Sequence, residues 1–233
     1  KAHGLTLTHI DCTNSSFNYG YPMSPRRYKM DGKRASDLIG TRQRIVEATL
    51  HLHGQNGIFG TSWKDIAREA DVSVGTVYKH FPDLDALIPA CGELLMERVQ
   101  PPQPDQIGDI LAGATDACDR LERVAATLFA FYERGGRHLD SDLRERELPA
   151  MREWEDYLRA LVAGFVREAL AGGGEDGDDA GKLAFLFDFP TFRSLRIRGT
   201  TPDDAARIVA GLAGAWLKAA KSGLPAANNP PDS

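Results

Sequence analysis

The segment 61–81 places the tightest limit on what this chain can fold into. Its first half carries small apolar residues at helical spacing, and the pattern breaks at Asp71. Ser73 then offers a helix cap to a second short run, which ends near His80. The segment therefore predicts two short helices that cross closely at a tight turn.

Helical periodicity also dominates the rest of the chain, and no stretch shows the strict alternation of a half-buried strand. We therefore expect an all-α protein of about nine helices. Prolines predict a kink at Pro89, a split at Pro149 and a kink or break near Phe189, where Pro190 falls mid-helix. The expected helices span about residues 38–54, 62–70, 73–80, 83–99, 105–118, 120–134, 141–171, 178–198 and 202–221.

Composition shifts along the chain suggest four parts. Residues 1–36 read as a flexible basic arm, and the alternative for this stretch is a tag or an over-long gene start. A three-helix domain with the helix-turn-helix follows at 37–98, and a larger helical domain follows at 99–222. The Pro-rich end, 223–233, reads as a disordered tail.

Charge is unevenly distributed, although the whole chain carries a net charge of −5. Residues 26–80 hold 10 Lys/Arg against 6 Asp/Glu, whereas residues 81–233 hold 17 against 26. A basic front on an acidic body fits a small nucleic-acid-reading module joined to a larger domain.

Several functions are disfavoured by what the sequence lacks. The three cysteines are far apart, and His51 and His53 point to different faces of a helix, so we expect no metal or other cofactor. No apolar run is long enough for a membrane span, and a cytoplasmic location is the expectation. An enzyme is the weakest alternative, because no nucleophile, base and stabiliser converge.

The second helix of the turn has the character of a surface that enters a major groove. Val77 and Phe81 can anchor it, which leaves Ser73, Thr76 and Lys79 on an outward polar face. A plain helical hairpin is the alternative, but it would rarely begin its second helix with small hydroxyl and glycine residues.

The run from Ile66 to Phe81 closely resembles the DNA-binding domain of the TetR (tetracycline-repressor-type) family, and the resemblance extends over about residues 38–98. It implies that Val74 and Thr76 face bases, that the end of the helix contacts phosphates, and that the start of the preceding helix binds phosphate through hydroxyl and N–H groups. For Tyr78, a half-buried core role is the alternative. The residues expected at the DNA are Thr61, Ser62, Lys64, Ser73, Val74, Gly75, Thr76, Tyr78, Lys79 and His80.

Two positions depart from the family pattern. Asp71 stands where the family commonly has Gly, and Asp tolerates the left-handed turn. Leu84 and Asp85 stand where the family commonly has Lys before an acidic residue, so one phosphate contact is expected to be missing. The basic arm is a candidate to replace it.

The resemblance also implies a homodimer on a near-palindromic double-stranded operator, with a C-terminal half that senses a small ligand. A repressor released by a small apolar or aromatic effector is the expected mechanism; an activator, or a regulator of this fold without any ligand, is the alternative. The expected pocket residues are Phe129, Met151, Trp154, Tyr157 and Phe185. The expected dimer interface comprises Leu183, Leu186, Phe187, Leu195, Ile208, Leu212 and Ala215.

Overall fold

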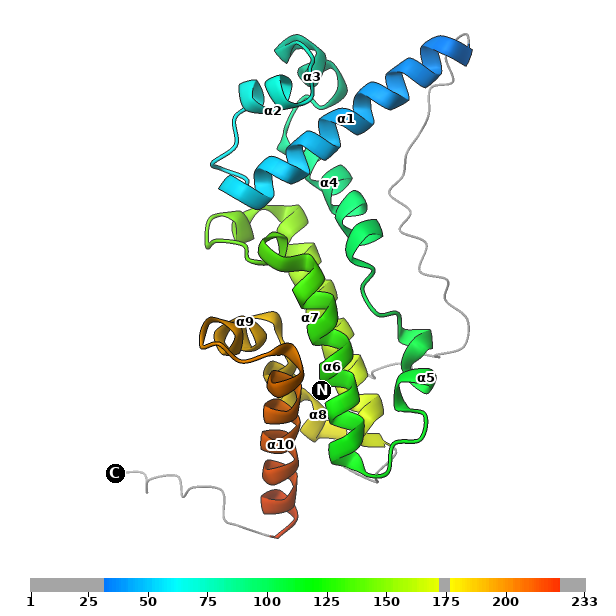
Figure 1. Ribbon diagram of the computed structural model, residues 1–233, viewed down its shortest axis with the longest axis vertical. Coiled ribbons are helices and arrows are strands. Elements are labelled where there is room, and N and C mark those ends of the chain that lie inside the picture. Colours follow the sequence, from blue (N-terminus) through cyan, green and yellow to red (C-terminus); the bar gives the residue numbers. More distant parts are fainter. Residues whose placement is uncertain (1–31, 172–176, 223–233) are drawn as a thin grey trace, which may run out of the picture. The chain divides into compact units, whose positions relative to one another are not determined.

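A computed structural model describes residues 32–171 and 177–222, and within these ranges all regular secondary structure is helical, without strands (Figure 1). The α-helices are α1 (Gly32–Asn56), α2 (Trp63–Glu69), α3 (Val74–His80), α4 (Leu84–Val99), α5 (Ile107–Leu111), α6 (Ala117–Gly135), α7 (Pro149–Ala171), α8 (Gly177–Leu183), α9 (Phe189–Ile197) and α10 (Pro202–Lys221). Short 3₁₀ turns lie at Pro104–Gln106, Gly136–Leu139, Glu145–Glu147 and Ala184–Phe187. The all-α prediction is confirmed.

Two predicted helices differ from the structure. The helix expected at 105–118 is only a 3₁₀ turn and the five residues of α5, because Gly113 adopts φ 73° and ends it. The helix expected at 178–198 is divided into α8, a 3₁₀ turn and α9, and the extended backbone of Asp188 confirms the break predicted near Phe189. Pro190 lies in the first turn of α9, where its missing N–H costs nothing.

The N-terminal boundary also differs, because α1 begins at Gly32 rather than near residue 38. Its first residues therefore belong to a helix and not to the predicted arm. The remainder of that arm, with Arg26, Arg27 and Lys29, lies outside the described residues, as does the predicted tail at 223–233.

The first four helices share one apolar core. Ile45 of α1, Ile66 of α2 and Val77 of α3 are at most 2% exposed. Phe81, which caps the end of α3, and Leu87 of α4 close the same core. Pro89 lies inside α4, and the helix continues past it to Val99. The core holds the two short helices against longer ones, because seven-residue helices are not stable alone.

Helix α6 is the centre of the C-terminal half. Asp116 caps it by accepting from the Asp119 N–H at 2.9 Å, and Gly136 at φ 51° ends it. It packs along α10 and against α7, and α6 and α10 run side by side in Figure 1. No described helix is long and apolar enough to cross a membrane.

Candidate DNA-binding interface

Two side-chain caps build the turn between α2 and α3. The Ser62 hydroxyl accepts from the Asp65 N–H at 3.2 Å, and the Ser73 hydroxyl accepts from the Thr76 N–H at 3.0 Å. Asp71 lies between them at φ 52°, so the chain makes the left-handed turn without a glycine, as predicted. Buried Ala67 and Ala70 allow the close crossing of the two helices.

Helix α3 has one buried face and one exposed face. Val77 is 0% exposed and anchors the helix, whereas Ser73, Gly75, Tyr78 and Lys79 are exposed. Val74, Thr76 and His80 are half-buried. The seven residues other than Val77 are the ones predicted to contact DNA, and the structure leaves each of them at least partly accessible.

Gly75 has no packing reason to be a glycine. A Cβ added there would meet only the Ser73 Oγ, at 3.8 Å. Its φ is not positive either, so the backbone does not require it. The absent side chain therefore leaves room on the outer side of α3, where another molecule's backbone can approach.

Tyr78 is held by a residue that the sequence analysis missed. Its ring stacks on Trp63 with centroids 4.9 Å apart and planes 27° apart, and its side chain remains 47% exposed. This exposure fits both a contact to phosphate and the alternative of a half-buried ring with its hydroxyl at the surface. The sequence feature that could have identified Trp63 is its position as the first residue of α2, next to α3.

The hydroxyls of Thr61 and Ser62 are occupied within the protein, which corrects part of the prediction. Thr61 Oγ1 donates to the Gly57 carbonyl at 2.8 Å, and Ser62 Oγ donates to Asp65 Oδ2 at 2.5 Å. A hydroxyl has one proton to donate, so neither can give it to a phosphate in this arrangement. The first N–H groups of α2, at Trp63 and Lys64, have no intrahelical acceptor and remain for that role.

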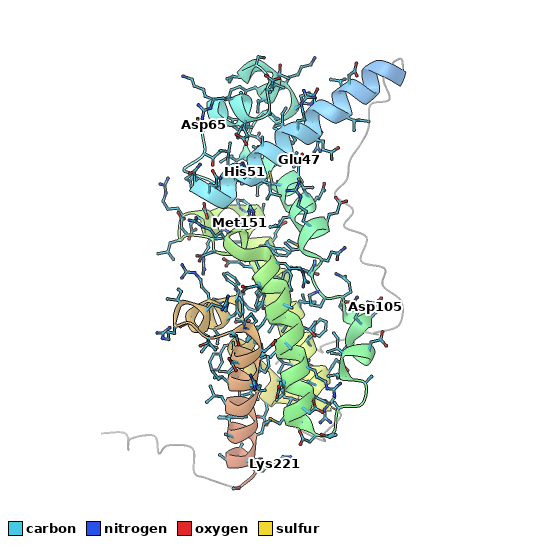
Figure 2. The ribbon with its side chains drawn as sticks, viewed as in Figure 1. Glu47, His51, Asp65, Asp105, Met151 and Lys221 are labelled. Carbon is cyan, nitrogen blue, oxygen red and sulfur yellow. The ribbon has the colours of Figure 1, made fainter. Side chains whose placement is uncertain are left out.

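Two arginines of α1 also reach this region, and neither was predicted. Arg44 Nε donates to the Ala70 carbonyl at 3.4 Å, and the Arg42 guanidinium lies 4.8 Å from the centroid of the Phe81 ring. Partial burial, with the charges of Lys79 and Arg42, lowers the pKa of His80. This shift favours the neutral imidazole, which has a single ring N–H to donate. Figure 2 shows His51 on α1 and Asp65 on α2 in this part of the molecule.

The five predicted pocket residues are not brought together. Phe129 is 0% exposed and packs on Phe192 with ring centroids 5.0 Å apart, so it belongs to the core. Phe185 is 60% exposed at the surface. Trp154 and Tyr157 stack at 5.4 Å on α7, half-buried like Met151, which Figure 2 labels on the same helix.

A groove does lie along α7, but none of those five residues lines it. Its lining combines apolar side chains of α5 and α7 with two charged ends: Pro104, Ile107, Ala160, Leu161, Gly164, Phe165, Arg167 and Glu168. Sequence reasoning missed it because it depends on α5, which was predicted as part of a longer helix.

The predicted dimer residues divide into two groups. Leu183 and Phe187 are 3% and 0% exposed within one chain, and the Phe187 carbonyl accepts from the buried Tyr132 hydroxyl at 3.0 Å. They serve the core, which corrects their assignment to a surface. Leu186 and Leu195 are half-buried, whereas the remaining three lie exposed on α10: Ile208, Leu212 and Ala215.

The described part of the chain holds no group of three side chains that could bind a metal ion. Cys91 is buried, and burial raises the pKa of its thiol to about 12. This thiol is protonated at neutral pH and packs as a small apolar side chain.

Comparisons with known proteins agree with this geometry. Residues 45–91 match the family described as bacterial regulatory proteins, tetR family. The chain is 37% identical over 65 residues to the HTH-type transcriptional regulator AcrR of Shigella flexneri, a match that covers 28% of this chain and 30% of AcrR. It is 30% identical over 95 residues to the uncharacterized HTH-type transcriptional regulator YvdT of Bacillus subtilis (strain 168), with 41% and 47% covered.

These two relatives are matched over less than half of their own length. For the larger part of the chain, solved structures supply the comparison. The chain is similar to a putative TetR-family transcriptional regulator from Rhodococcus sp., with a TM-score of 0.54, 20% identity and coverage of 76% of this chain and 98% of that one. A putative transcriptional regulator from Pseudomonas aeruginosa PAO1 gives a TM-score of 0.50 at 22% identity, with 84% and 94% covered.

The structural likeness establishes the all-α fold. The matched segment, 45–91, contains the whole helix-turn-helix with its caps, its left-handed turn at Asp71 and the exposed face of α3. The helix-turn-helix segment of this chain, residues 45–91, matches the TetR family of bacterial regulatory proteins.

Proposed function

We propose that this protein regulates transcription by inserting α3 into the major groove of a specific DNA operator. The observation that carries the proposal is the exposed polar face of α3 on a helix that Val77 anchors in the core. Gly75 also supports the proposal, because no packing contact inside the protein requires a glycine at this position. Bases would be read by Val74 and Thr76, and phosphates would be bound by Tyr78, Lys79 and the N-terminus of α2.

A homodimer is part of this proposal. Ile208, Leu212 and Ala215 lie at helical spacing on the outer face of α10, and Trp216 extends the stripe. Pairing this stripe with its twofold mate would bury apolar side chains that the single chain leaves in water. Two recognition helices would then face half-sites about 34–36 Å apart, so the operator would be a near-palindrome.

Release of the operator by a small apolar or aromatic ligand is the mechanism we propose for regulation, acting on chromosomal DNA in the cytoplasm. The supporting feature is the stacked Trp154–Tyr157 pair on α7, whose half-buried rings could be covered by a flat molecule. A regulator that works without a ligand is the second candidate, because the other predicted pocket residues serve the core or are exposed.

A direct test of DNA binding starts from duplexes selected by the full-length protein out of a random pool. We expect Lys79→Ala to weaken binding roughly tenfold and to reduce the slope of log affinity against log salt by about one phosphate contact. Lys218→Ala, an exposed charge on α10, is the control and should bind like the wild type. Equal affinity and equal slope for both variants would refute the assignment of α3.

Sedimentation tests the dimer independently of DNA. Leu212→Arg places a charge at the centre of the exposed stripe, so the dimer mass should be lost. Leu143→Arg changes a residue that is 83% exposed on a loop and should leave the dimer intact. A dimer that survives Leu212→Arg would exclude this interface.

A further inference from the structure

The turn between α1 and α2 is touched by a segment far along the chain, residues 136–147. The His138 ring packs against Gly54 so closely that a Cβ there would lie 2.5 Å from it. The Arg144 guanidinium lies 4.6 Å from the centroid of the Phe59 ring. Glu145 makes the third contact, by a hydrogen bond to the turn itself.

Glu145 is unusual among the acidic residues of the described chain, because it is only 6% exposed. Its Oε1 accepts from the Ile58 N–H at 2.5 Å, and its Oε2 accepts from the Asp142 N–H at 3.0 Å. One carboxylate thus joins two backbone amides 84 residues apart in sequence. Hydrogen bonds to a buried charged group are strong, and leaving one unmade is costly.

The turn is shaped to receive this carboxylate. Gly57 adopts φ 76°, a conformation that favours glycine, and a Cβ on it would lie 2.8 Å from Glu145 Oε1. Gly57 therefore serves both the turn and the approach of Glu145.

The same turn fixes the start of α2. The Thr61 N–H donates to the Ile58 carbonyl at 3.3 Å, and its hydroxyl donates to the Gly57 carbonyl. Ser62, the next residue, caps α2. Ile58, whose amide donates to Glu145, thus lies four residues before the cap of α2.

The segment that carries Glu145 is itself tied to the C-terminal helices. Arg146 pairs with Glu155 of α7 at 3.2 Å, and Asp140 pairs with Arg193 of α9 at 2.7 Å. A continuous set of contacts therefore runs from α7 and α9 through Glu145 to the N-terminus of α2.

We propose that Glu145 is a positioning residue for DNA binding: its carboxylate holds the α1–α2 turn and so fixes the position of α2 and of α3, which packs against it. This role rests on the proposed function above. Glu145 does not touch DNA in this scheme, and it acts only through the Ile58 amide and the turn that follows.

The test compares Glu145→Gln with Glu147→Gln in the full-length protein. Glutamine at 145 keeps one acceptor but turns an N–H donor toward a second donor, so one of the two hydrogen bonds is lost. Glu147 lies exposed on the same 3₁₀ turn, which makes it the matched control. Hydrogen exchange of the turn 57–62 and binding to the selected duplex are measured for both.

For Glu145→Gln we expect exchange of the Ile58 amide to accelerate and DNA affinity to fall about tenfold, the change that a lost hydrogen bond to a charged group gives. The salt slope should also fall by about one contact, which a loss of stability alone would not cause. Gly57→Ala should produce the same three changes by displacing the carboxylate, and it decides the matter if Glu145→Gln does not fold.

Each outcome has a distinct meaning. If the wild type binds duplex and Glu145→Gln binds with unchanged affinity and slope, the positioning role is wrong while the proposed function stands. If the wild type selects no duplex at all, the proposed function is wrong, and the role of Glu145 falls with it.

Discussion

The helix-turn-helix and the C-terminal half of this protein differ in where their determining contacts lie along the sequence. In the helix-turn-helix, the caps at Ser62 and Ser73 each join residues three apart. In the C-terminal half, the Tyr132 hydroxyl bonds the Phe187 carbonyl, and the Arg196 guanidinium pairs with Glu133 at 2.8 Å. These partners are 55 and 63 residues apart.

This difference explains which predictions held. A cap or a tight turn is a local property, so its residues can be recognised in order along the chain. Whether an aromatic side chain lines a pocket or fills the core depends on helices that meet only after folding. Local signals therefore located α3 and its exposed polar face, whereas the predicted pocket residues are scattered.

The largest expected effect separates two aromatics that the sequence placed in one pocket. Phe129→Ala should destabilise the protein by about 3–5 kcal/mol, because it removes a ring packed against Phe192 and Tyr132. Phe185→Ala should cost less than about 0.5 kcal/mol, since that side chain is 60% exposed. Chemical denaturation measures both, and similar losses would contradict their separation into core and surface.

The next effect concerns pH and the end of α1. Burial, with a smaller effect of the nearby His138, lowers the pKa of His53 from 6.5 to about 4. As the pH falls below 6.5, His53 becomes protonated in the unfolded chain but stays neutral in the folded chain. The contribution of His53 to the free energy of unfolding is therefore fully present above pH 6.5 and declines toward pH 4. The loss attributable to His53 approaches about 3 kcal/mol.

Measuring the free energy of unfolding against pH for wild type and His53→Gln checks this assignment. The variant should show a flatter profile between pH 6.5 and 4. His51→Gln, on the exposed side of the same helix, is the control and should keep the steep profile. Parallel profiles for the wild type and His53→Gln would show that other groups cause the decline.

A substitution at Gly75 should change stability only slightly, and it tests the proposal that the outer side of α3 approaches DNA. Gly75→Ala should raise stability by about 0.4–1 kcal/mol, because alanine has less backbone freedom to lose and a Cβ meets no close neighbour. DNA affinity should fall nonetheless, since the methyl group occupies the outer side of α3. Thermal unfolding and binding to the selected duplex are measured together, and unchanged affinity would remove Gly75 from the interface.

Sequence reasoning missed the contacts that hold the recognition helix in place. The stack of Trp63 on Tyr78 joins two helices across the turn, and Arg42 reaches Phe81 from α1. Neither contact follows from periodicity, which states only which face of a helix is apolar. The hydroxyl of Thr61 was misassigned for the same reason, because its acceptor is a carbonyl of the preceding turn.

The sequence by itself determined the all-α class, the two short helices with their caps, and the tolerance of a left-handed turn at Asp71. These features depend on intrinsic backbone preferences and on hydrogen bonds between near neighbours, so a few consecutive residues are enough to specify them. Only the tertiary structure decided that Phe129 and Phe187 fill the core, that Ile208 and Leu212 are left exposed, and that Glu145 reaches Ile58. Burial and long-range hydrogen bonding depend on which helices pack together, and that choice is made by the whole chain at once.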